Sequence, residues 1–75
     1  MGERFGVEAK KYELTEAILI LKGFKEPPTR ELYICYICLK VGKAKKMAEE
    51  LVKMMETVGL IKIEDNKVSL LKEEL

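Results

Sequence analysis

The stretch that decides the fold is GKAKKMAEELVKMMETVGLIKIEDNKVSLL, residues 42–71. Between residues 43 and 58, apolar and polar side chains fall on opposite halves of a helix with 3.6 residues per turn. Gly59 follows where a helix commonly ends in a left-handed residue, so the pattern predicts a helix over 43–58. Its apolar half comprises Ala44, Met47, Ala48, Leu51, Val52, Met54, Met55 and Val58.

After this helix, apolar residues alternate with polar ones, which predicts a β-hairpin over residues 60–71. Asp65-Asn66 suits a two-residue turn, because both residues tolerate positive φ. Centring the turn there places the four apolar residues on one face and closes the hairpin with an opposite-charge pair. The resulting pairs are Ile63 with Val68, Ile61 with Leu70, and Glu64 with Lys67.

Upstream, the pattern predicts a loose start over residues 1–7 and a helix over 8–22 that stops at Gly23. The helix has one apolar face with the spacing i, i+3, i+4, i+7. Three further apolar side chains lie off that face, so we expect the helix to be covered on more than one side. The face consists of Leu14, Ala17, Ile18 and Leu21, and the others are Tyr12, Leu19 and Ile20.

A second helix is expected over residues 29–40, beginning at an N-cap Thr29 that follows two prolines. The apolar run 32–39 has strand propensity, but the length available before Gly42 favours a helix. This helix is apolar at almost every angle, which a small protein can hardly cover alone. We therefore expect one face to meet the first helix and the other to form a homodimer interface. The interface candidates are Tyr33, Ile34, Tyr36 and Ile37.

The 75 residues are expected to form a single domain, 1–75, with a small core. The net charge of +1 does not indicate a class of partner. No apolar run is long enough to span a membrane or serve as a signal peptide, so we expect a cytoplasmic protein. Twelve Lys and twelve Glu, with one Asn and no Gln, resemble the residue usage of thermophile proteins.

The order of helices and hairpin resembles the winged helix-turn-helix family, in the form of a small archaeal-type regulator. The features that carry the resemblance are Cys38, the Val41-Gly42 turn, Ala48 with Leu51, Gly59-Leu60 and the alternating residues 61–70. The resemblance implies a mainly helical α+β fold, with three helices followed by a two-stranded β-hairpin wing. It also implies double-stranded DNA as the partner, with the third helix in the major groove and the wing on phosphate or the minor groove.

By that resemblance, the DNA-binding candidates are Lys43, Lys45, Lys46, Lys53, Lys62 and Lys67. Lysines at a helix N-terminus oppose the helix dipole, whereas bound phosphate would favour them. The alternative is a solvated face on which Lys45 pairs with Glu49 and Lys46 with Glu50. The function expected is a homodimeric transcriptional regulator. A winged-helix module that docks onto a protein through the apolar second helix is the alternative.

Cys35 and Cys38 have the CxxC spacing, but the chain lacks the further Cys or His ligands of a zinc site. Buried structural cysteines are expected, with an inter-chain disulfide or shared metal as the alternative. Met47, Met54 and Met55 are interpreted as core residues, with an apolar groove as the alternative. With no His and no phosphate-binding loop, we expect no catalytic function, no metal, no cofactor and no small-molecule substrate.

Overall fold

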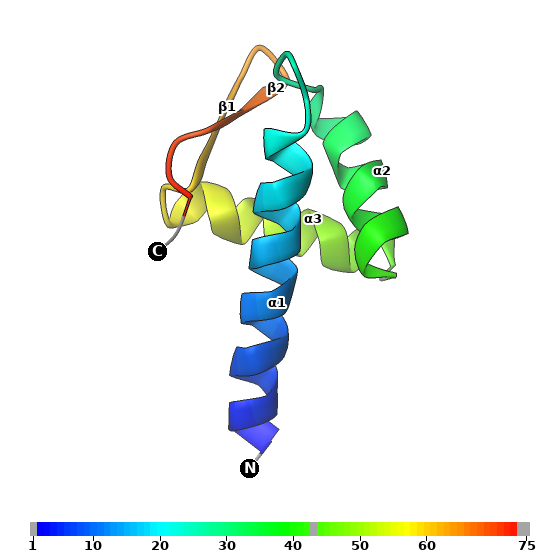
Figure 1. Ribbon diagram of the computed structural model, residues 1–75, viewed down its shortest axis with the longest axis vertical. Coiled ribbons are helices and arrows are strands. Elements are labelled where there is room, and N and C mark those ends of the chain that lie inside the picture. The colour runs from blue at the N-terminus through cyan, green and yellow to red at the C-terminus, as the bar shows by residue number, and fades with distance from the viewer. Residues whose placement is uncertain (1, 43, 74–75) are drawn as a thin grey trace.

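A computed structural model describes residues 2–42 and 44–73 of the chain. Three helices are followed by a two-stranded antiparallel hairpin (Figure 1). The expected mainly helical α+β layout, three helices and then a hairpin, is thereby confirmed. The elements are α1 (Gly2–Lys22), α2 (Arg30–Val41), α3 (Lys45–Thr57), β1 (Ile61–Glu64) and β2 (Lys67–Leu70).

The first helix is longer than expected, since α1 begins at Gly2 and its N-terminal half extends beyond the other elements (Figure 1). The prediction of a loose start over residues 1–7 is therefore wrong for residues 2–7, and Met1 lies outside the described residues. Gly2 and Gly6 lower helix propensity by about 1 kcal/mol each. Once a helix has nucleated, however, each added residue gains a hydrogen bond at little further cost.

The apolar face predicted for α1 is buried, and it packs against both α2 and α3. The prediction that α1 is covered on more than one side is wrong, because Tyr12 and Leu19 are exposed and Ile20 is only partly buried. The elements that contact α1 are α2, α3 and β2, and they leave Tyr12 and Leu19 uncovered. The buried residues of this face are Leu14, Ala17, Ile18 and Leu21.

The apolar run 32–39 is helical, which resolves its ambiguity between helix and strand. Thr29 caps α2 as expected, with its Oγ1 accepting a hydrogen bond from the Leu32 N–H at 3.2 Å. Gly42 ends the helix with φ of +72°, and its N–H donates to the Cys38 carbonyl at 2.9 Å. That left-handed conformation costs glycine nothing and costs other residues about 1–2 kcal/mol.

The hairpin has the predicted register in every pair, from Ile61 with Leu70 to Glu64 with Lys67. Both turn residues have positive φ, 52° for Asp65 and 61° for Asn66, as a type I′ turn requires. This turn matches the right-handed twist of the strands. The register therefore follows from local chemistry at the turn combined with apolar alternation along the strands.

A third backbone segment, which the sequence did not reveal, pairs with β2. The Val68 N–H donates to the Pro28 carbonyl at 2.8 Å, and the Arg30 N–H donates to the Asn66 carbonyl at 3.0 Å. Between them, Thr29 forms an antiparallel bridge with Lys67. These bonds fasten the start of α2 to the hairpin turn. One isolated bridge has no periodicity along the chain, so pattern reasoning cannot detect it.

The core lies where the three helices meet the inner face of the hairpin, and four α3 residues belong to it. Three others that were predicted on the buried half of α3, Ala44, Met47 and Val58, are exposed. They lie at the two ends of the helix, beyond the reach of the small core. No helix in the described part of the chain is long and apolar enough to cross a membrane. The buried α3 residues are Ala48, Leu51, Val52 and Met55.

Gly59 provides a test of the join between α3 and the hairpin. Its φ is +83°, and a Cβ added there would meet no atom within 4 Å. Gly59→Ala should therefore lower the free energy of unfolding by about 1–2 kcal/mol through backbone strain alone. Urea unfolding followed by circular dichroism measures this loss. Thr57→Ala, on the exposed side of the same helix end, should change stability by less than about 0.5 kcal/mol. Equal losses in the two variants would contradict the prediction.

Candidate nucleic-acid interface

The N-terminus of α3 carries positive charge where helices usually carry negative charge. Its N-cap is Ala44, which has no side-chain acceptor, and its first turn contains no acidic residue. Lys45 and Lys46 occupy that turn, and both side chains are exposed. The first backbone N–H groups of a helix have no partner within it and attract anions. Cations and unsatisfied donors therefore meet at one end of α3.

Lys45 and Lys46 form no ion pair with a carboxylate of residues 2–42 or 44–73. The only ion pairs within 4.0 Å among the described residues are Lys22–Glu73 and Lys62–Glu64. The alternative pairings, Lys45 with Glu49 and Lys46 with Glu50, are therefore not formed. Lys43, the first residue of the predicted site, lies outside the described residues.

An open hollow of about 470 Å³ runs along the outer face of α3 and reaches the start of α2. It brings together two of the predicted lysines, Lys46 and Lys53, with Arg30, and it also contains three glutamates. The hollow is therefore of mixed charge, and an anionic ligand would meet attraction and repulsion along the same helix. Its lining residues are Arg30, Lys46, Glu49, Glu50, Val52, Lys53 and Glu56.

Arg30 is the site residue that sequence reasoning missed. As the first residue of α2, it lines the hollow, and its backbone N–H is bonded to the hairpin turn at Asn66. The neighbouring bridge between Thr29 and Lys67 brings one of the two hairpin lysines close to Arg30. Lys67, Arg30 and the α3 lysines thus lie on adjacent elements. The available signal was the position of Arg30 directly after the Thr29 cap.

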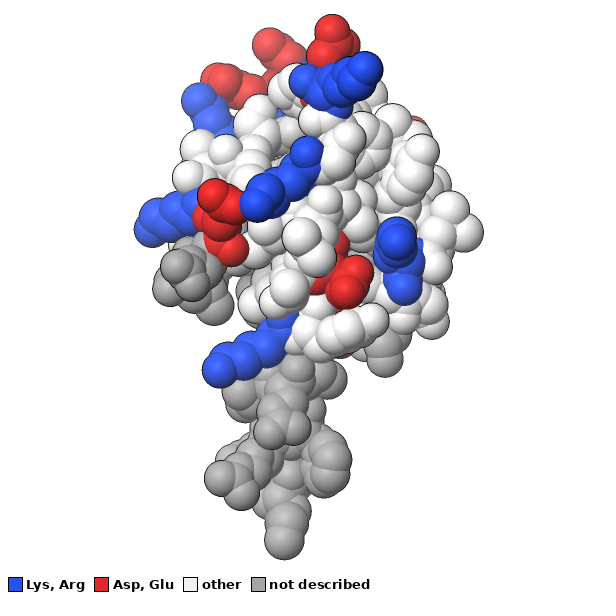
Figure 2. All heavy atoms as spheres, in the orientation of Figure 1, with Lys and Arg blue, Asp and Glu red and all other residues white. Residues whose placement is uncertain are grey.

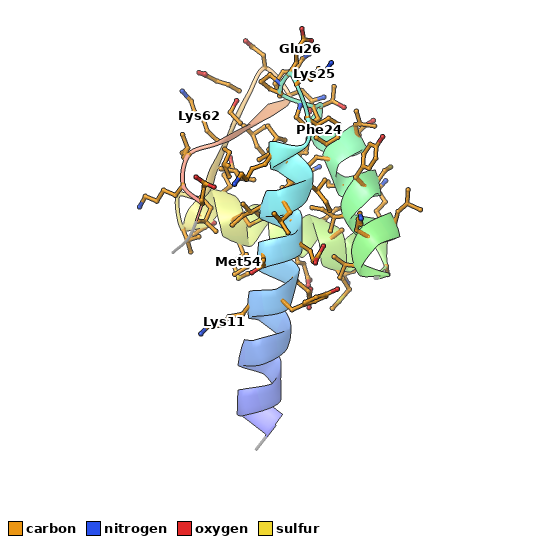
Figure 3. The ribbon with its side chains drawn as sticks, in the orientation of Figure 1. Lys11, Phe24, Lys25, Glu26, Met54 and Lys62 are labelled. Carbon is orange, nitrogen blue, oxygen red and sulfur yellow. The ribbon has the colours of Figure 1, made fainter. Side chains whose placement is uncertain are left out.

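The two hairpin lysines differ in their surroundings. Lys62 lies on the outer side of the hairpin, away from α2 (Figure 3), and its Nζ is 3.1 Å from Glu64 Oε1. Lys67 stands opposite the same Glu64 in the strand register. Acidic and basic side chains gather together at the end of the molecule that contains the hairpin turn and the α1–α2 connector (Figure 2). Glu64 therefore partly neutralises the positive charge of the hairpin.

The predicted dimer interface needs correction. Tyr33, Ile34 and Ile37 are almost entirely buried within this chain, so they cannot form a surface. The Tyr33 hydroxyl donates to the Ala17 carbonyl at 2.7 Å, and it also approaches Met55 Sδ at 3.9 Å. Tyr36 alone of the four candidates is exposed. The error arose because a helix that is apolar all round gives no indication of which angle faces the core.

The sulfur residues also differ from expectation. Cys35 is exposed and Cys38 is only partly buried, so the prediction of two buried cysteines is wrong. Met55 is in the core and Met54 packs against it, whereas Met47 is exposed. No group of three or more potential metal ligands occurs in the part of the chain that the structure describes.

No protein-family model, curated protein or solved structure matches this chain. The kind of ligand that the chain can bind is therefore inferred from the chemical groups on its surface. The basic groups around α3 are the exposed ammonium groups of its lysines and the half-buried Arg30. Ammonium and guanidinium groups bind phosphate through charge-assisted hydrogen bonds. The arrangement places cationic groups at the first turn of α3, at the start of α2 and on the hairpin, together with the three glutamates of the hollow.

Proposed function

We propose that the chain is a winged-helix protein that binds double-stranded DNA as a small homodimeric transcriptional regulator. In this proposal α3 enters the major groove and the hairpin acts as the wing beside it. The order of three helices and a hairpin supports the proposal. So does the position of Arg30, which links the outer face of α3 to the hairpin turn.

The observation that carries the proposal is the exposed, unpaired lysine pair at the first turn of α3. Two cations beside the positive end of a helix cost stability, by about 0.3–1 kcal/mol each at low salt. Within the part of the chain that the structure describes, no carboxylate lies within 4.0 Å of Lys45 or Lys46 to offset that cost. A DNA phosphate at this helix end would offset it, because the backbone N–H groups and both ammonium groups favour an anion.

The chemistry of the face favours weak sequence specificity for each protomer. The outer side of α3 presents Lys and Glu, and it lacks the Asn, Gln or Arg side chains that read base edges through paired hydrogen bonds. Arg30 offers one guanidinium group for phosphate or guanine. A homodimer that reads two half-sites would raise specificity above that of a single protomer.

Binding should depend strongly on salt. Contacts from Arg30, Lys45, Lys46, Lys53 and Lys67 would release counterions with a log–log slope of roughly −4 to −5 per protomer. Repulsion from the three glutamates in the hollow limits the affinity. We therefore expect dissociation constants in the micromolar range for random-sequence DNA at low salt.

Fluorescence anisotropy of a labelled random-sequence duplex at about 50 and 200 mM salt tests the proposal. The double variant Lys45→Glu/Lys46→Glu should bind at least about tenfold more weakly, with a salt slope shallower by about 2. The double variant Lys11→Glu/Lys72→Glu changes net charge equally on exposed positions outside α3 and the hairpin, and it should bind almost like the parent. Absence of binding at 50 mM salt, or equal losses in both variants, would contradict the proposal.

The second candidate is a winged-helix module that docks onto another protein through α2 without binding DNA. The observation that favours it is the row of exposed apolar residues on the outer side of this helix, including Leu32, Tyr36 and Leu39. In that case, the Lys45→Glu/Lys46→Glu variant would keep its protein partner. Substitutions on α2 would remove it.

A further inference from the structure

The outer side of α2 carries a continuous apolar stripe that the core does not use. Leu32, Cys35, Tyr36 and Leu39 have the spacing i, i+3, i+4, i+7, which places them on one face of a helix, and all four are exposed. Leu39 is the extreme case, with 81% of its surface in contact with solvent. Tyr33, Ile34 and Ile37 face the opposite way, into the core. We call these four exposed residues the α2 stripe.

The stripe continues onto α1 through a hollow of about 400 Å³ between the two helices. Tyr36 lies at the join, and its ring packs edge-on against Phe24 with centroids 5.1 Å apart. Phe24 lies two residues beyond the end of α1 (Figure 3). Over α2 and the described part of α1, Figure 2 shows mainly uncharged surface with a few charged side chains. The hollow is lined by Leu19, Ile20, Gly23, Phe24, Tyr36 and Lys40.

The exposed area fits a dimer of small proteins. Leu19, Leu32, Tyr36 and Leu39 have exposed fractions of 54%, 44%, 44% and 81%. Taking about 150 Å² for each side chain, the lower end of the range for aromatic residues, they present roughly 330 Å² of side-chain surface. A standard interface covers about 800 Å² on each partner, of which about 65% is apolar in homodimers, or roughly 500 Å². The patch therefore supplies most of the apolar surface that a stable homodimer needs.

The two leucines of the stripe lie at equal distances from its centre along the chain. The sequence from Glu31 to Lys40 is ELYICYICLK, with leucines at the second and ninth places and the pair Cys35-Tyr36 at its centre. Its ends carry opposite charges, Glu31 and Lys40. Two copies laid antiparallel therefore bring leucine to leucine, and an acidic end near a basic end. The antiparallel arrangement also opposes the two helix dipoles favourably. An interface related by a two-fold axis requires such self-complementarity.

We propose that a second copy of this chain covers the α2 stripe, with the two α2 helices antiparallel about a two-fold axis beside Cys35 and Tyr36. Leu32 then packs against Leu39 of the partner subunit. Cys35 lies close to Cys35 of the partner subunit on one flank, and Tyr36 lies close to Tyr36 of the partner subunit on the other. The inference rests on the homodimer of the proposed function and assigns its interface. It does not depend on DNA binding, because its tests use protein alone.

Light scattering across about 1–100 µM protein tests whether a second copy of the chain covers the α2 stripe. The parent should be dimeric, and Leu39→Glu should weaken dimerisation at least about tenfold, because it places a charge in the desolvated contact with Leu32 of the partner subunit. The matched control is Leu71→Glu, an exposed leucine beyond the hairpin with 56% of its surface exposed, which should remain dimeric. Circular dichroism should show unchanged helix content in both variants. A monomeric parent, or a Leu39→Glu variant that dimerises like the parent, would overturn the proposal.

Thiol crosslinking tests the contact at the axis. Diamide, an oxidant that accepts the two protons and two electrons of a thiol pair, should link two copies of Cys38→Ser through Cys35. The Cys35→Ser variant keeps only the partly buried Cys38 and should crosslink at least about tenfold more slowly. Fast linkage through Cys38, or none through Cys35, would overturn the placement of the axis.

Orientation is tested in a background that carries both Cys35→Ser and Cys38→Ser. Leu32→Cys and Leu39→Cys are introduced separately into this background, and the two proteins are then mixed. The antiparallel interface should give mainly the mixed disulfide between them. Preferential crosslinking of each variant with itself would indicate a parallel dimer and overturn the proposed geometry.

Discussion

Tyr33→Ala should lower the free energy of unfolding by about 3–5 kcal/mol, the range for removing a large aromatic side chain from a core. No part of the Tyr33 surface reaches solvent, and its hydroxyl joins α2 to α1 through the Ala17 carbonyl. The side chain also reaches Met55 of α3. Its removal leaves a cavity where the three helices meet. Since the free energy of unfolding of small domains is about 5–15 kcal/mol, this substitution would remove a large part of it.

Guanidinium unfolding at fixed protein concentration measures this loss. Tyr12→Ala is the matched control, because Tyr12 is an exposed tyrosine on α1, and its stability should change by less than about 0.5 kcal/mol. Tyr33→Phe keeps the ring and removes only the hydrogen bond, so it should cost about 0.5–1.5 kcal/mol. A Tyr33→Ala variant as stable as Tyr12→Ala would show that this residue is not at the centre of the core.

Alkaline pH should destabilise the protein through the same residue. Burial raises the pKa of the Tyr33 hydroxyl above its ordinary value of about 10. Below pH 10 the hydroxyl is protonated in both states, and its contribution to stability is complete. Above pH 10 it ionises in the unfolded chain and stays protonated in the folded one. The unfolded state then binds fewer protons, so stability falls by up to about 1.4 kcal/mol per pH unit until the folded pKa is reached.

Urea unfolding at pH 9, 10 and 11 measures this slope. Lysines titrate in the same region, so the contribution of Tyr33 is the difference between the parent and Tyr33→Phe. We expect the variant to lose stability less steeply, by up to about 1.4 kcal/mol per pH unit above pH 10. Identical slopes for the two proteins would contradict the assignment to Tyr33.

Features with strong local signals were predicted well. The hairpin register follows from alternation along residues 61–70 and from two turn residues that accept positive φ. Thr29 and Gly42 bound α2 as their capping chemistry predicts. Each of these features depends on residues close together in the chain. Their physical causes are therefore visible without the fold.

The candidate site was predicted in part. Lys45, Lys46 and Lys53 are exposed on α3 as its amphipathic pattern indicated. Arg30 was missed because its place beside α3 depends on packing between helices and on a single backbone bridge to the hairpin. Whether the lysines at the N-terminus of α3 form ion pairs also depends on side-chain positions, which the sequence does not specify. From the sequence alone, ion pairs between Lys45 and Glu49 or between Lys46 and Glu50 could be neither predicted nor excluded.

The sequence by itself determined the order of three helices and a hairpin, the caps of α2, the turn and the register, because these depend on local periodicity and backbone conformation. Only the tertiary structure decided which side of α2 faces the core, since an all-apolar helix has no preferred angle until α1 and α3 pack against it. That packing buried Tyr33, Ile34 and Ile37 and left Leu32, Tyr36 and Leu39 at the surface. The physical reason is that a small core can cover one face of such a helix and must leave the other exposed.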